Sequence, residues 1–158
     1  MKKRSKYKPK PVNMMAHLVA MQGACKLTRT DAIRFSMQVQ DAVTLISQGQ
    51  ATKQHWQELF SVINIMEALV MMGKAKDEDK AIEQMQTAVI DILDRTKKTG
   101  SKALYPNELA TLREIVATYA DLLCEITQSE LFAASQMSEE RIIRALKGKD
   151  PTARFVHV

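Results

Sequence analysis

Apolar and polar residues recur at helical spacing through most of the chain. From Thr30 to Gly49, apolar side chains return every three or four residues, which places them on one side of a helix. The predicted buried stripe of this first helix consists of Ala32, Phe35, Val39, Ala42, Val43 and Ile46. Thr30 is the expected N-cap, Asp31 lies in the first turn where negative charge is favourable, and Gly49 is expected to end the helix.

A second helix is predicted between Thr52, as its N-cap, and Gly73. Positions 62–72 are apolar on nearly every side, so this helix has to be covered from several directions and is predicted to form the centre of the fold. Asn64 and Glu67 are polar exceptions that share a face at i,i+3 spacing. We expect a buried polar or interface pair there, because a buried amide or carboxylate needs a hydrogen-bond partner.

The third predicted helix runs from about Asp77 to Thr99. Acidic residues crowd its start and basic residues its end, which matches the helix dipole at both ends. The acidic residues are Asp77, Glu78 and Asp79, and the basic residues are Arg95, Lys97 and Lys98. Its buried stripe is predicted to contain Ile82, Met85, Val89, Ile92 and Leu93.

The longest predicted helix starts with Pro106 in its first turn. Its apolar period extends through Ile126 and as far as Met137. Ser138 is expected to start either a bent continuation or a short separate helix, which Gly148 ends.

These elements predict an all-α fold, an antiparallel helical bundle of four long helices plus short terminal helices. We expect a flexible basic N-terminal arm at residues 1–11, a single helical-bundle domain at residues 12–148 and an irregular C-terminal tail at residues 149–158. Composition supports a globular domain, with 46% hydrophobic and 26% charged residues and only 5 Gly and 4 Pro. A chain of 158 residues buries enough surface to fold without a cofactor, metal or disulfide.

The net charge of +5 belongs to the arm. Six of the 23 basic residues lie in the first ten positions without any acid, which leaves 17 basic against 18 acidic residues in the rest of the chain. The arm carries Lys2, Lys3, Arg4, Lys6, Tyr7, Lys8 and Lys10. Its cations could neutralise phosphates while Tyr7 stacks on a base, but a solubilising tail and docking onto an acidic protein surface are equally open interpretations.

The sequence offers no catalytic, cofactor or metal site. His17, His55 and His157 lie in unrelated places, and no Glu-x-x-His pair is present for a metal in a helical bundle. The five glycines form no phosphate-binding loop, and each of them except Gly23 lies where a helix is expected to end. We therefore predict that the protein is not an enzyme.

Cysteine spacing and hydropathy place the chain in the bacterial cytoplasm. Cys25 and Cys124 are far apart, without a CxxC motif, and are predicted to be buried, reduced thiols. No run of about 18 apolar residues is present, so no membrane span is predicted. The ten methionines are expected to fill the core, whereas exposed methionines beside the 14–21 segment would indicate a protein-binding groove or a dimer contact.

Three segments carry a resemblance to a known group of proteins. These are KKRSKYKPKPV in the arm, INIMEAL in the second helix and LYPNELATL at the start of a later helix. Together they resemble small α-helical proteins carried by temperate phages and prophages of proteobacteria. By position, the resemblance singles out Lys6, Lys8, Lys10, Asn64, Glu67, Glu108 and Leu109. It implies a protein that adjusts host or phage machinery by binding it, including counter-defence and transcriptional roles.

We therefore expect a non-enzymatic accessory or regulatory protein that binds a host or phage macromolecule. A protein partner and a homo-oligomer are the expected associations, with no cofactor and no membrane. The alternative is a sequence-nonspecific nucleic-acid-binding protein that uses the basic arm.

Overall fold

The computed structural model describes residues 23–77 and 80–148, and every element named within these ranges is a helix. The helices are α2 (Arg29–Ser47), α3 (Lys53–Met71), α4 (Ala81–Thr99), α5 (Pro106–Glu125) and α6 (Gln128–Leu146). The predicted all-α fold is confirmed. The arm at residues 1–11, which holds Lys2, Lys3, Arg4, Lys6, Tyr7, Lys8 and Lys10, and the tail at residues 149–158 lie outside the described ranges.

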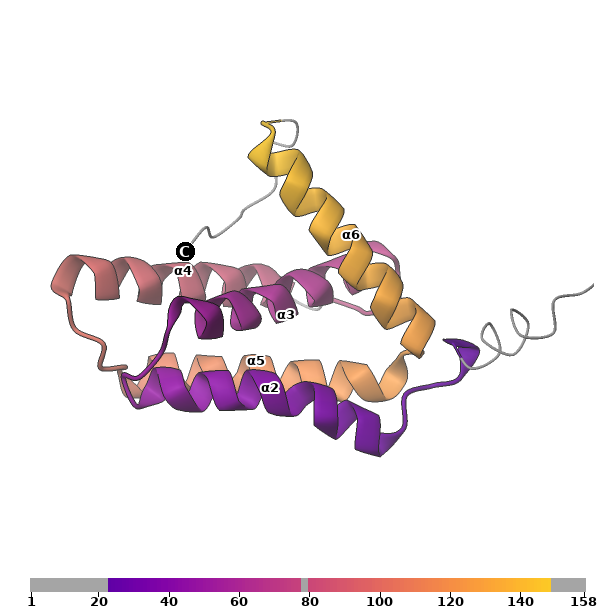
Figure 1. Ribbon diagram of the computed structural model, residues 1–158, viewed down its shortest axis with the longest axis horizontal. Coiled ribbons are helices and arrows are strands. Elements are labelled where there is room, and N and C mark those ends of the chain that lie inside the picture. The colour runs from indigo at the N-terminus through magenta and orange to yellow at the C-terminus, as the bar shows by residue number, and fades with distance from the viewer. Residues whose placement is uncertain (1–22, 78–79, 149–158) are drawn as a thin grey trace, which may run out of the picture.

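The first four of these helices run alternately in opposite directions, and α6 crosses them obliquely (Figure 1). Helix α2 packs against α3 and α5, and α4 packs against the same two helices. Helix α6 packs against α3, and its C-terminal half rises away from the other helices (Figure 1). Helix α3 therefore contacts each of the other four.

The side chains of α3 form the middle of the core. Leu59, Ile63, Met66 and Leu69 are completely buried, as expected for a helix that is apolar on nearly every side. Burying one such side chain stabilises the fold by about 1.5–3 kcal/mol. Covering α3 is therefore a major contribution to the stability of the protein.

Glycines end most of the helices, as the sequence predicted. A positive φ, which glycine adopts without a steric penalty, occurs at Gly49, Gly73, Gly100 and Gly148. The junction between α5 and α6 has no glycine, and the chain turns there at Ile126, whose backbone is extended.

Two predicted helix starts need correction. Helix α2 begins at Arg29 with Thr28 as its N-cap, not Thr30, because the Thr28 hydroxyl accepts a hydrogen bond from the backbone N–H of Asp31 at 3.2 Å. Helix α4 begins at Ala81, four residues after Asp77. The Asp77 carboxylate instead accepts a hydrogen bond from the N–H of Ile82 at 3.0 Å and satisfies the helix end from outside.

The predicted helix that continued toward Met137 is in fact two helices. Helix α5 ends at Glu125, and Thr127 begins α6 with a capping box. The Thr127 hydroxyl accepts from the N–H of Glu130 at 3.2 Å, and the Glu130 carboxylate accepts from the N–H of Thr127 at 2.9 Å. The described residues thus hold five long helices rather than four, and Ser138, the expected helix start, is buried in the middle of α6.

Small side chains and ion pairs attach α6 to α3. Ala134 and Ser138 are the buried residues of α6, and their small size lets the two helices approach closely. Near the start of α6, the Lys74 ammonium lies 2.7 Å from the Glu130 carboxylate.

The predicted polar pair on α3 contributes a second attachment. A guanidinium nitrogen of Arg141 in α6 lies 2.9 Å from the Glu67 carboxylate, which also accepts a hydrogen bond from the Gln86 amide of α4 at 3.2 Å. Glu67 thus joins three helices. The Asn64 amide is partly buried, and the structure records no hydrogen bond from it to any described residue.

Glu108, which the resemblance singles out, holds the junction between α4 and α5. Arg95 donates two hydrogen bonds of 2.7 Å to its carboxylate and packs over the Tyr105 ring at 4.5 Å. Burial alone would raise the pKa of Glu108, but the hydrogen bonds from Arg95 and from the Tyr105 N–H outweigh burial and lower it. Leu109 packs partly buried against the core, so both positions have structural roles here.

We expect Glu130→Gln to weaken the attachment of α6. Hydrogen bonds from Lys74 and from the Thr127 N–H lower the pKa of Glu130 from 4.5 to about 2, so its carboxylate stabilises the folded state above pH 4.5 and loses this effect as the pH falls through 2. Urea denaturation should show a loss of about 1 kcal/mol at pH 7, as for other helix caps. The difference from the unaltered protein should shrink as the pH falls.

Glu140→Gln is the matched control, because Glu140 pairs only with exposed Arg144 at 3.5 Å. Equal losses in the two variants, or a loss in Glu130→Gln that does not change with pH, would show that the capping box does not hold α6.

Candidate functional site

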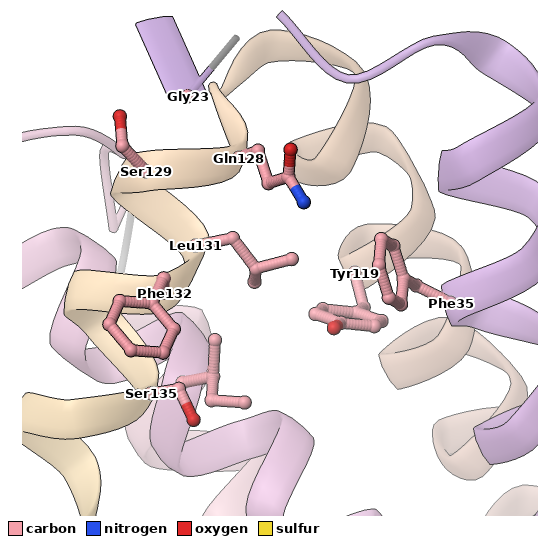
Figure 2. A pocket seen from close by; sticks show the side chains of 9 residues that line it. Gly23, Phe35, Tyr119, Gln128, Ser129, Leu131, Phe132 and Ser135 are labelled. Carbon is pink, nitrogen blue, oxygen red and sulfur yellow. The ribbon is translucent and has the colours of Figure 1, made fainter. Parts of the chain in front are cut away.

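The oblique course of α6 leaves an apolar cleft of about 620 Å³ beside it. Phe35 of α2 and Tyr119 of α5 form one wall, and Leu131 and Phe132 of α6 form the other (Figure 2). Ile65 of α3 also lines it. A cleft of this volume is in the range that binds a drug-sized ligand or several protein side chains.

Two aromatic side chains of the cleft are exposed. Phe35 is 38% exposed and Phe132 is 63% exposed. Phe35 belongs to the stripe of α2 that was predicted to be buried, and the structure buries the other five members, Ala32, Val39, Ala42, Val43 and Ile46. Because α6 packs on α3, this part of α2 stays uncovered. The sequence therefore identified Phe35 as an inward-facing residue but not as part of a site.

Polar groups also face the cleft. Tyr119 is only 5% exposed, yet its hydroxyl points into the space between the walls (Figure 2). Burial raises the pKa of Tyr119 to about 12. The structure records no hydrogen bond from this hydroxyl to any described residue, whereas the Gln128 amide lies across the cleft from it (Figure 2). An occupant with a hydrogen-bonding group would satisfy the Tyr119 hydroxyl.

The chain that precedes α2 is fixed at the edge of the cleft. The Leu27 N–H donates a hydrogen bond of 3.1 Å to the Ile126 carbonyl at the junction of α5 and α6. Gly23, which lines the cleft, packs so closely on Ser129 that an added Cβ would lie 3.4 Å from the Cβ of Ser129. The described chain thus begins at the first turn of α6.

Exposed apolar side chains continue from the cleft along α6. Phe132 and Ile143 are 11 residues, or about three turns, apart, so they lie on the same side of the helix, and Leu146 follows one turn later. Ile143 is 50% exposed and Leu146 is 57% exposed. Exposed Glu139 lies on the same side between them. We call Phe132, Glu139, Ile143 and Leu146 the α6 stripe, which spans roughly 21 Å.

The comparisons with known proteins add nothing to this geometry. The chain matches no protein-family model, no curated protein and no solved structure. The cleft and the α6 stripe are therefore interpreted from their own residues.

The other candidate groups have structural roles or lie apart from the cleft. The Nδ1 atom of His55 accepts a hydrogen bond from the Thr52 N–H at 3.0 Å and so helps to cap α3. Across residues 23–77 and 80–148, no three His, Cys, Asp or Glu side chains are close enough to hold a metal ion. None of the helices in these ranges is long and apolar enough to cross a membrane. His17 and His157 lie outside the described residues.

The prediction of buried cysteines was wrong. Cys25 and Cys124 are both exposed. Cys25 precedes α2, and Cys124 lies in the last turn of α5, where helical spacing turns its side chain away from buried Leu123. A low-polarity residue was taken as evidence of burial, and the local helix phase decided otherwise.

We expect the Tyr119 phenol to titrate near pH 12, well above its ordinary value of 10.0. Because the pKa is raised in the folded state, the contribution of this residue to stability is present below pH 10 and is lost as the pH rises through 12. Ring-carbon NMR shifts measured against pH should show one such tyrosine, absent in Tyr119→Phe. Titration of Tyr119 near 10 would mean that the inner wall of the cleft is open to water.

Proposed function

We propose that this protein is a non-enzymatic binding protein that holds an apolar helical segment of a partner protein in the cleft and along the α6 stripe. One observation carries the proposal. Phe35 and Phe132 stand exposed on opposite walls of an apolar cleft, while the neighbouring stripe residues of α2 are buried. Exposed apolar surface that is gathered in one place is characteristic of binding sites.

The shape of this surface favours a segment of protein over a small molecule. The cleft continues into the α6 stripe, and the two together extend along most of α6. A compact ligand would fill the cleft and leave Ile143 and Leu146 uncovered. An amphipathic helix lying alongside α6 would cover both parts, as helices do when they bind in grooves of other helical proteins.

The residues of the stripe also restrict the partner. Apolar side chains at i, i+3 or i+4 and i+7 of the partner helix would contact Phe132, Leu131 and Phe35. A basic side chain is expected opposite Glu139, since a buried or half-buried carboxylate without a partner would weaken the complex. A carbonyl or polar side chain near the helix end can accept the proton of the Tyr119 hydroxyl.

The setting that we propose is a phage or prophage accessory protein in the bacterial cytoplasm. It rests on the resemblance of the arm, of the INIMEAL segment and of the LYPNELATL segment to small helical phage proteins. In that setting the partner is a host or phage protein, and the binding event regulates it. A second copy of this chain also meets the chemical description of the partner.

Phe132→Ser tests the proposal. We expect a protein captured from a bacterial lysate by the unaltered chain to bind this variant roughly 30-fold more weakly, which is the loss of about 2 kcal/mol typical of a central aromatic residue in an interface. The matched control is Ile33→Ser. Ile33 is 53% exposed and lies on the other side of α2 from Phe35, so it should leave binding unchanged.

Binding is measured with the purified partner by calorimetry, and sedimentation shows whether that partner is a second copy. Equal binding by Phe132→Ser and the unaltered chain would refute the assignment of the cleft. A strictly monomeric chain that retains no specific protein would refute the proposed function.

A further inference from the structure

We propose that residues 12–22 of the same chain occupy the cleft and the α6 stripe until a partner displaces them. These residues lie outside the described ranges, so the inference rests on the described residues that receive them. It also rests on the proposed function, because it names an internal competitor for the partner site. The cleft would then be a regulated site, closed by the protein itself.

The first argument is the point at which the chain reaches the cleft. Gly23 and Ala24 are helical, and Gly23 lines the cleft and packs on Ser129 in the first turn of α6. The hydrogen bond from the Leu27 N–H to the Ile126 carbonyl fixes this entry. Residue 22 is therefore one peptide bond from the cleft wall.

The second argument is the chemistry of the segment. Its sequence, VNMMAHLVAMQ, contains no Asp, Glu, Lys or Arg. At helical spacing, Met14, Leu18 and Met21 share one face, whereas Ala16 lies on the opposite one. Methionine side chains adapt to irregular apolar surfaces, so this face suits a cleft whose walls are Phe35 and Phe132.

The third argument joins length to charge. Eleven helical residues extend about 16 Å, the same length as α6 from Ser129 to Glu140. A helix that ran back along α6 from Gly23 would bring residue 12 close to Glu139 and Glu140, both of which are exposed. The basic arm would then start beside these two carboxylates, which explains why an uncharged segment is preceded by six cations.

A tether this short makes the contact effective even when each contact is weak. Linking a segment directly to its site gives an effective concentration in the millimolar range. A free partner has to compete with this concentration, and any change that releases residues 12–22 raises the apparent affinity of the site by the fraction of chains that open.

The test uses the full chain with 13C-labelled methionine methyl groups. We expect the Met14 and Met21 methyl signals to be shifted upfield by the rings of Phe35 and Phe132, to the same extent at every protein concentration. Leu18→Glu should abolish the shift, since it places a charge on the docking face. Ala16→Glu, which places the same charge on the opposite face, should retain it, and Phe132→Ser should reduce it.

Three outcomes overturn the inference. The first is a methionine spectrum that does not change between Leu18→Glu and the unaltered chain. The second is an equal loss of the shift in Ala16→Glu and Leu18→Glu. The third is a shift that disappears on dilution, which would show that the segment binds a second copy.

A synthetic peptide of residues 12–24 provides a second measurement. It should bind Leu18→Glu, whose cleft is open, several-fold more tightly than it binds the unaltered chain, and Phe132→Ser added to Leu18→Glu should remove this binding. Equal binding to all three proteins would overturn the inference. The partner experiment with Phe132→Ser is independent of these results, so loss of the methyl shift with partner binding intact would defeat the inference and leave the proposed function standing.

Discussion

The burial of α3 is the constraint on which the rest of the structure depends. A helix with apolar side chains on nearly every side cannot face water, and Leu59, Ile63, Met66 and Leu69 are fully buried because four other helices surround it. Helices α2, α4 and α5 provide an antiparallel set, and α6 covers the side that they leave open. Ala134 allows α6 to come close, and the ion pairs of Glu67 and Glu130 set where it lies. The cleft exists because α6 follows α3 and so departs from α2 and α5.

Local rules were enough to predict most of this fold from the sequence. Periodic apolar residues located the helices, and the glycines at positions 49, 73, 100 and 148 located their ends. The break between α5 and α6 was missed because the apolar period continues through Ile126 without a glycine or proline. The signal that was available there was the pair Thr127 and Glu130, whose three-residue spacing is that of a capping box.

The candidate site could not be predicted in the same way. Phe35 has the spacing of a core residue, and only the path of α6, nearly a hundred residues later, leaves it exposed. Glu67 was expected to need a partner, but nothing local indicates that this partner is Arg141. Sites that form between elements distant in sequence depend on packing angles, which a single helical period does not encode. The predicted roles of the arm and the tail lie outside the described residues and stay predictions.

The central claim is that the space between α6 and α2 is where this protein binds an apolar segment. The most direct test is a photoreactive amino acid at position 135, where Ser135 lines the cleft, compared with one at position 91, where Asp91 is exposed on α4. Mass spectrometry then identifies the cross-linked residues. We predict discrete cross-links from position 135, to residues 12–22 or to a partner, and none of these from position 91. The same products from both positions, or none from position 135, would contradict the account.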